Sequence, residues 1–324
     1  MTVVSLTGRT GAKKWSATKM GGVGVTAIFL VFWFALRIDH ATLLVETPSE
    51  TQTTKAARKS IAIAFLGNSI LFVNDTPRLL QNMLEAAGYQ AHQDSCMAGG
   101  TNFRTLWRFG NNMKGSFSTP AALLEDGVTY DVGAAKVKDL FDDDNSHFDY
   151  VVLNDQTQAP ARVASRQDSI EQLQQHYLPL WKDQVVVFLQ TAAYSKSIPD
   201  ISDLEPFDRF TDLLNKGLQE YVKACQEVLS DCRIAPLGEA VRVVKQQDEA
   251  LWKELYLKDG RHFTQIGTWL EACVIYATVM KAEPPKYDSS WWKTSRAVLK
   301  GRAPTDDEAE RLRQVAMATC LQGE

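Results

Sequence analysis

The chain has 324 residues, of which 45% are hydrophobic and 23% are charged, a balance that excludes a largely disordered protein. Its formal net charge of -4 shows no basic excess, so nucleic acid is not an expected partner. The five cysteines are scattered and have no C-x-x-C spacing, which excludes a disulfide-rich scaffold and offers no zinc site. The length suits one α/β domain with extensions.

The N-terminal segment combines basic residues with an apolar run. Four basic residues within the first 19 precede an uncharged stretch from Met20 to Leu36, which Arg37 ends. This stretch is about long enough to cross a bilayer core, and the basic residues before it favour a cytoplasmic N-terminus. A cleavable signal peptide and a buried core helix are the alternatives, but no small-x-small cleavage site follows. We therefore expect a cytoplasmic segment (1–19), a single-pass transmembrane signal anchor (20–38) and a domain on the periplasmic or extracellular side.

After a polar linker (39–59), apolar runs alternate with amphipathic segments up to residue 282. Strands are predicted at 61–66, 89–95, 149–153, 184–189 and 233–237, and helices at 77–87, 132–141, 169–181, 207–229, 240–247 and 266–280. The strands at 61–66 and 184–189 are short continuous apolar runs, which is typical of strands buried on both faces, whereas the signal at 233–237 is weak. This alternation predicts an α/β fold, a three-layer doubly wound parallel sheet, over residues 60–282.

A C-terminal helical extension occupies residues 283–324. Thr305 and Glu308 have the spacing of a capping box and predict a helix from about 305 to 321. The sequence leaves open whether this extension packs on the domain or lies near the membrane. It also leaves open a Cys225–Cys232 disulfide, because two helical turns would hold these residues about 10 Å apart whereas a turn would let them pair.

The candidate nucleophile is Ser69, in Gly67-Asn68-Ser69 directly after the first predicted strand. A side chain there lies at the carboxyl edge of the sheet, where open α/β folds bind their ligands. If Ser69 begins a helix, its backbone N–H faces the site and the helix dipole favours developing negative charge. Taken alone, the tripeptide favours a helix N-cap over a nucleophile.

Three later segments supply possible helpers. Gly99 follows the second strand and offers a bare backbone N–H, and the Asn154 and Gln156 amides follow the third strand, where each could donate to an oxyanion. Asp259 and His262 stand three residues apart before the last apolar helix, so the carboxylate can orient the imidazole. A simple turn, loop polarity and a metal site are the respective alternatives, and no third metal ligand lies beside the Asp-x-x-His pair.

Together these four segments resemble the conserved blocks of the SGNH (GDSL-like) hydrolases, in which Ser, Gly, Asn and His follow successive strands of a flavodoxin-like sheet. The resemblance covers about residues 61–280, and Gly67-Asn68-Ser69 is similar to a subgroup with Asn in the nucleophile block. It implies Ser69, His262 and Asp259 as catalytic triad, with Gly99, Asn154 or Gln156 and the Ser69 N–H as oxyanion donors. It implies no cofactor and no metal.

The expected function is a membrane-anchored serine esterase that removes short acyl groups, such as acetyl, from a carbohydrate or other small ester substrate. The choice of carbohydrate as substrate rests on the family resemblance alone. An O-acyltransferase with the same triad and a catalytically silent, membrane-anchored glycan-binding protein are the alternatives. The complete set of triad residues weighs against the silent protein. The acyl group, the alcohol and the oligomeric state are not determined by the sequence.

Overall fold

The computed structural model describes residues 58–112, 133–142, 147–295 and 298–321. Within them the chain forms a five-stranded, fully parallel sheet in the order β2-β1-β3-β4-β5. The strands are β1 (Ser60–Gly67), β2 (Gln90–Met97), β3 (Tyr150–Leu153), β4 (Val185–Leu189) and β5 (Cys232–Ala235). The α/β class is confirmed, and the strand order is that of flavodoxin-like doubly wound folds.

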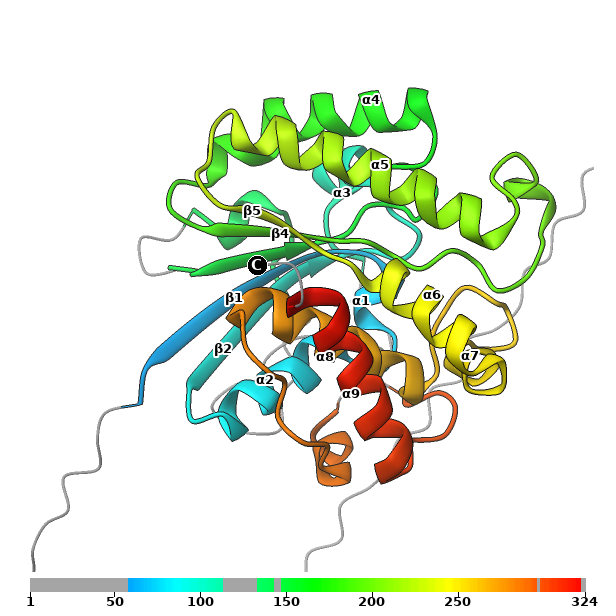
Figure 1. The fold of residues 1–324 in the computed structure, drawn as a ribbon. Helices are drawn as coiled ribbons and strands as arrows, with labels where there is room; N and C mark the ends of the chain where they lie inside the picture. The colour runs from blue at the N-terminus through cyan, green and yellow to red at the C-terminus, as the bar shows by residue number, and fades with distance from the viewer. Residues whose placement is uncertain (1–57, 113–132, 143–146, 296–297, 322–324) are drawn as a thin grey trace, which may run out of the picture. The chain divides into compact units, whose positions relative to one another are not determined.

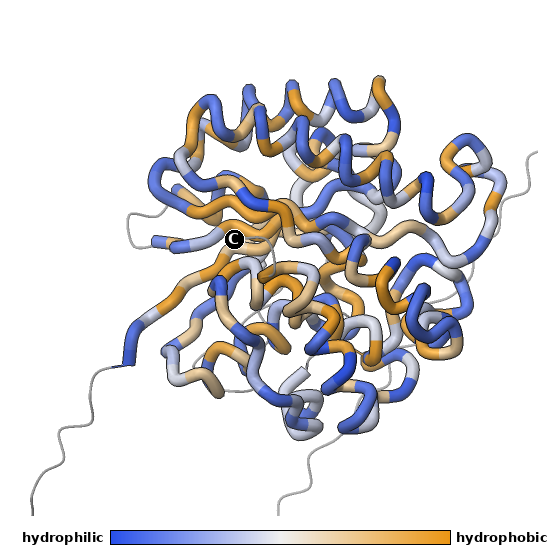
Figure 2. The backbone as a smooth tube through the Cα atoms, in the orientation of Figure 1, coloured by the Kyte–Doolittle hydropathy of each residue, from blue (hydrophilic) through white to orange (hydrophobic). Residues whose placement is uncertain are grey.

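The three central strands, β1, β3 and β4, are hydrophobic on both faces because helices cover both faces. In β1, Ile63 and Phe65 point into one core, whereas Ala64 and Leu66 point into the other. The neighbouring strands add valines and leucines to each side, so both faces exclude water. Figure 2 shows the hydrophobic residues concentrated in the sheet and on the inward sides of the helices.

Two helical layers enclose this sheet (Figure 1). One layer contains α1 (Ser69–Phe72), α2 (Thr76–Ala86), α6 (Leu237–Gln247), α7 (Glu249–Leu255), α8 (Gln265–Met280) and α9 (Asp306–Leu321). The other contains α3 (Phe103–Phe109), α4 (Val163–Gln172) and α5 (Phe207–Gln226). α8 is buried along almost its whole length because it packs against α2, α6, α7 and α9 as well as the sheet. That position explains its apolar sequence without a membrane.

Two helix predictions differ from the structure. The helix predicted at 169–181 begins earlier, as α4, and then changes to a π-helical turn (Leu173–Tyr177) and a 3₁₀ turn (Leu178–Leu180). Pro179 has no N–H and disfavours a regular helix before it, which gives a physical reason for the break. Of the segment predicted at 132–141, the described part contains only the short 3₁₀ helix Lys138–Leu140. A further 3₁₀ turn, Pro199–Ile201, precedes α5.

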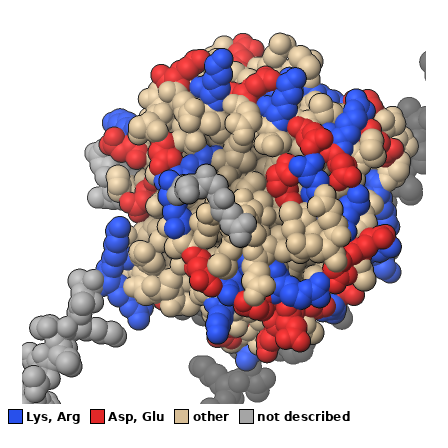
Figure 3. Space-filling model, in the orientation of Figure 1, with Lys and Arg blue, Asp and Glu red and all other residues tan. Residues whose placement is uncertain are grey.

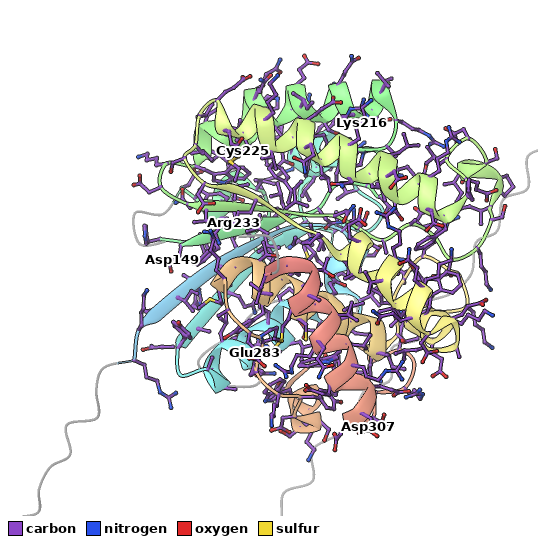
Figure 4. All side chains as sticks on the ribbon, viewed as in Figure 1. Asp149, Lys216, Cys225, Arg233, Glu283 and Asp307 are labelled. Carbon is purple, nitrogen blue, oxygen red and sulfur yellow. A yellow bond between two sulfur atoms is a disulfide. The ribbon has the colours of Figure 1, made fainter. Side chains whose placement is uncertain are left out.

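The C-terminal extension packs on the domain. α9 lies along α8, and the Trp269 indole N–H donates to the Ala309 carbonyl at 2.9 Å. The predicted capping box is present: the Thr305 N–H donates to the Glu308 carboxylate at 2.8 Å, and the Glu308 N–H donates to the Thr305 hydroxyl at 3.3 Å. A 3₁₀ helix, Ser289–Thr294, links α8 to this region. The C-terminal extension, in which Glu283 and Asp307 are labelled in Figure 4, therefore belongs to the same layer as α8.

The predicted anchor (20–38) and nearly all of the linker lie outside the described residues. Within the described ranges, no helix has both the length and the apolar character needed to cross a bilayer. On the face drawn in Figure 3, acidic and basic side chains are interspersed, and no broad field of one sign is visible there.

Cys225 and Cys232 form a disulfide, which settles the pairing that the sequence left open. α5 ends at Gln226 and the chain then turns into β5, so the two Cα atoms lie 6.3 Å apart, within bridging range. Both cysteines are buried between α5 and the sheet (Figure 4). Cys96, Cys273 and Cys320 are free thiols.

Candidate active site

The parallel register brings the predicted site segments to one edge of the sheet. Gly67, the last residue of β1, pairs with Met97 of β2, and Leu66 pairs with Leu153 of β3. The segments that carry Ser69, Gly99 and Asn154 therefore leave three adjacent strands at the same carboxyl edge. The backbone confirms this continuity, because the Ala98 N–H donates to the Gly67 carbonyl at 3.0 Å.

At this edge Ser69, His262 and Asp259 form a continuous chain of hydrogen bonds. The distance between Ser69 Oγ and His262 Nε2 is 2.8 Å, and that between His262 Nδ1 and Asp259 Oδ2 is 2.6 Å. Because an ionised carboxylate can only accept, Nδ1 carries a proton and Nε2 is free to accept the Ser69 hydroxyl proton. The three residues are brought together across 193 positions of sequence.

The Asp259 carboxylate is held by its own loop. Its second oxygen, Oδ1, accepts hydrogen bonds from the backbone N–H groups of Arg261 (2.9 Å) and His262 (3.0 Å). Partial burial would raise the pKa of Asp259, but the His262 hydrogen bond and these two N–H groups outweigh it and lower the pKa below its usual value. Gly260 supports the turn with a φ of +70°. The carboxylate is thus held ionised in the orientation that fixes the His262 ring.

Asn68 joins the nucleophile segment to both neighbouring loops. Its buried amide nitrogen donates to the carbonyls of Thr101 (3.0 Å) and Asp155 (3.1 Å). Its Oδ1 accepts from the Ile70 N–H at 3.2 Å, as the N-cap of α1, and from the Asn154 amide at 2.9 Å. Asn68 therefore acts as donor and acceptor at once, which an ionised aspartate cannot do.

The predicted oxyanion donors differ in their surroundings. The Ser69 backbone N–H has no hydrogen bond to any described residue, whereas the Gly99 N–H donates to Asn112 Oδ1 at 3.0 Å. Asn154 is buried, and its amide nitrogen donates to Asn68 Oδ1 and to the Asp155 carbonyl. Gln156 is exposed, and its amide has no hydrogen bond within the described ranges. Of these four groups, the Ser69 N–H and the Gln156 amide are the two without a hydrogen bond to the part of the chain that the structure describes.

Asp155 is a polar centre that the sequence did not reveal. It is fully buried, and its carboxylate accepts from the Ser169 hydroxyl (2.5 Å), the Tyr221 hydroxyl (2.8 Å) and the N–H groups of Phe103 (3.2 Å) and Gln156 (2.8 Å). Burial raises its pKa, although these four donors act in the opposite direction. Asp155 thus ties the loop after β3 to α3, α4 and α5. Its position beside Asn154 was the available signal, but nothing local identifies its partners.

Within the described ranges, no group of three or more His, Cys, Asp and Glu side chains is arranged to hold a metal ion. The aromatic residues considered for a ligand site have separate surroundings. Phe103 is buried, Trp107 stacks on the His176 ring with centroids 4.8 Å apart, and Phe109 is largely exposed. Phe103 is therefore a core residue.

Fold and site together define a doubly wound α/β protein with a Ser–His–Asp hydrogen-bond chain at the carboxyl edge of its sheet. No family model matches the chain, and no curated protein sequence matches it. Among solved structures, it is similar to a DUF4886 family protein from Bacteroides uniformis, with 17% identity and a TM-score of 0.59, covering 82% of this chain and 96% of that one. This likeness shows that the two share a fold.

Two further structures match with lower scores. One is a candidate SGNH hydrolase from Slackia heliotrinireducens, with 18% identity and a TM-score of 0.46 over 68% of this chain and all (100%) of that one. The other is a carbohydrate acetylesterase family member from Sinorhizobium meliloti, with 12% identity and a TM-score of 0.32 over 68% of this chain and 98% of that one.

Proposed function

We propose that this protein is a serine hydrolase that cleaves carboxylic esters, with Ser69 as the nucleophile. The observation that carries this proposal is the hydrogen-bond chain from Ser69 Oγ through His262 to Asp259, with links of 2.8 and 2.6 Å. Nucleophile, base and orienting carboxylate in hydrogen-bond contact are the arrangement that activates a hydroxyl for acyl transfer. The half-buried Ser69 is accessible from the carboxyl edge of the sheet.

In the proposed reaction, Ser69 Oγ attacks the ester carbonyl while His262 Nε2 takes the hydroxyl proton. The C=O π electrons move onto oxygen, giving a tetrahedral oxyanion, and Asp259 stabilises the imidazolium. Collapse breaks the bond to the alcohol, which leaves with the proton from Nε2. Water then repeats the sequence on the acyl-enzyme: His262 takes a water proton, the acid is released, and Ser69 Oγ regains its proton.

The proposal extends to the setting of the enzyme. The disulfide between Cys225 and Cys232 supports a location outside the cytoplasm, because such bonds persist mainly in oxidising compartments. The basic and apolar N-terminal segment supports a single-pass membrane anchor with the site on the same outer side. The resemblance to SGNH hydrolases supports short acyl groups on carbohydrate as substrate. A reporter fused after Glu324 tests the topology, since activity in the cytoplasm would contradict it.

The test uses the full-length protein with p-nitrophenyl acetate and a fluorophosphonate probe. Ser69→Ala and His262→Ala should each lower hydrolysis by more than about 10³-fold, and Ser69→Ala should abolish covalent labelling. Ser290→Ala is the control, because Ser290 is an exposed serine on the 3₁₀ helix Ser289–Thr294 of the C-terminal extension. Equal hydrolysis rates in the wild type and both site variants would refute the esterase. Labelling that persists in Ser69→Ala would refute the nucleophile.

A further inference from the structure

Asn74 lies five residues after Ser69, and its side chain is saturated with long-range hydrogen bonds. Its amide nitrogen donates to the Phe263 carbonyl at 3.0 Å and to the Thr268 hydroxyl at 3.1 Å. Its Oδ1 accepts from the Lys300 backbone N–H at 2.6 Å. The side chain is 1% exposed, so these bonds are shielded from water.

Asn74 itself belongs to the nucleophile segment, and its partners belong to the histidine segment and to a third segment. Phe263 directly follows His262, whereas Asn74 directly follows α1 and its C-cap. The hydrogen bond between them therefore connects the two sides of the 2.8 Å Ser69–His262 contact, and neither side chain of that contact takes part in it.

The third segment consists of Lys300 and Gly301 in the C-terminal extension, and we call it the C-terminal strap. Besides the Lys300 N–H bond to Asn74, the Lys300 carbonyl accepts from the Gln265 N–H at 3.0 Å, and the Gly301 carbonyl accepts from the Gln265 side chain at 2.6 Å. Gly301 lies so close to Thr264 that an added Cβ would come within 2.6 Å of its Cβ. The strap and Asn74 therefore bond to the same stretch of chain after His262, the strap through Gln265 and Asn74 through the Phe263 carbonyl and the Thr268 hydroxyl.

The backbone at this point is strained. Asn74 and Asp75 both have positive φ values, +60° and +62°, which non-glycine residues adopt at a cost of about 1 kcal/mol or more each. Asparagine tolerates this region better than most residues, and only an amide side chain also offers two donors and one acceptor. The three side-chain hydrogen bonds of Asn74 offset this strain. The backbone conformation at Asn74 is therefore held by these long-range bonds and not by local backbone preference.

Resting on the proposed function, we propose that Asn74 is a positioning residue. It sets the distance between Ser69 Oγ and His262 Nε2 by tying the end of the nucleophile helix to the Phe263 carbonyl and to the C-terminal strap. The histidine loop has other supports, including the Leu257 N–H bond to the His262 carbonyl at 2.8 Å. Loss of Asn74 should therefore misalign the site without unfolding the loop.

The test compares Asn74→Gly, Asn74→Asp and a matched control, Thr268→Val. Glycine keeps the positive φ and removes all three side-chain bonds, whereas aspartate keeps the acceptor for Lys300 and loses both donors. Thr268→Val removes one partner of Asn74 and leaves its bond to Phe263. Fluorophosphonate labelling of Ser69, kcat and KM for p-nitrophenyl acetate, and Tm are measured for full-length protein.

We expect both Asn74 variants to lose about 10- to 100-fold in kcat and in labelling rate, with KM little changed, because a displacement of about 1 Å can cost this much. The acid limb of the pH profile should stay in place, since Asp259 and His262 lie in one loop and keep their bond. Thr268→Val should lower Tm and retain kcat. Wild-type labelling in Asn74→Gly, or in a folded Asn74→Asp if the glycine variant does not fold, would overturn the proposal.

A different outcome tests the function on which this proposal rests. If wild-type protein is not labelled, or is labelled equally in Ser69→Ala, the hydrolase itself is refuted. If wild-type labelling depends on Ser69 but Thr268→Val loses as much kcat as Asn74→Gly at equal Tm, only the role of the Phe263 tie is refuted.

Discussion

Replacing Asn68 by aspartate tests why this chain has an amide where a carboxylate would preserve the shape. The substitution keeps the acceptor for Ile70 and Asn154 but removes both donated bonds. The Asp155 carbonyl still has the Asn154 amide, whereas no other group among the described residues donates to the buried Thr101 carbonyl, so that carbonyl loses its donor. An orphaned buried carbonyl costs about 1–3 kcal/mol, and the carboxylate is itself buried against two carbonyl oxygens.

We therefore expect Asn68→Asp to lower the free energy of unfolding by at least about 3 kcal/mol at pH 7. Protonation would restore one donor, so the pKa of the new carboxyl should be raised in the folded state. The stability of the variant should therefore be closest to that of wild type below about pH 4, and it should fall as the pH rises through the raised pKa.

Urea unfolding of wild type, Asn68→Asp and Gln156→Glu at pH 4 and pH 7 measures this. Gln156→Glu makes the same amide-to-acid change at an exposed position in the neighbouring loop, and it should stay within about 0.5 kcal/mol of wild type. An Asn68→Asp variant as stable as Gln156→Glu at pH 7, or one that becomes more stable as pH rises from 4 to 7, would refute the reasoning.

Three other changes have definite expected outcomes. Burial raises the pKa of Glu271 well above its usual value, so the wild type releases a proton on unfolding between about pH 4.5 and that raised pKa. Over this range Glu271→Gln should gain about 1.4 kcal/mol over wild type per pH unit, measured by unfolding at several pH values; a difference that does not change with pH would contradict this. Replacing both Cys225 and Cys232 by serine should lower the free energy of unfolding by about 2 kcal/mol and make Tm insensitive to reductant. A wild-type Tm that does not change on reduction would contradict this. Gly67→Ala should lower the free energy of unfolding in urea by more than about 2 kcal/mol and lower esterase activity, because the added Cβ would lie 2.0 Å from Asn154 Oδ1. A variant as stable as wild type would contradict this close contact.

The sequence predicted the sheet well because strands buried on both faces leave a local signal. The runs at 61–66, 149–153 and 184–189 became β1, β3 and β4, and the more polar segments predicted at 89–95 and 233–237 became β2 and β5, each with ends shifted by only a few residues. The short helices left no such signal. α4 is mostly polar and is held by Arg166, whose buried guanidinium bonds the Pro160 carbonyl and pairs with Glu220 on α5. A partner 54 residues away cannot be inferred from helical periodicity.

Part of the candidate site could also be predicted from the sequence, and part of it could not. The position of Ser69 directly after β1 was enough to place it at the carboxyl edge, because parallel strands align their ends. Asp259 and His262 follow no strand, and their role came from their three-residue spacing and from the family resemblance. What the sequence could not show is how amides are used once buried. Asn154 follows a strand and has two N–H donors, but both are directed at Asn68 and Asp155 rather than left for a ligand.

Energies therefore favour some of the predicted oxyanion donors over others. The Ser69 N–H is available at once, and the Gly99 N–H must exchange only the exposed Asn112 side chain, a replacement that water already makes inexpensive. Recruiting Asn154 would break one of its two buried hydrogen bonds, at a cost of about 0.5–1.5 kcal/mol, which offsets part of the roughly 3 kcal/mol that one oxyanion donor supplies. Under the proposed mechanism, the two backbone N–H groups hold the oxyanion, and the Asn68–Asn154 pair fixes the loops that carry them.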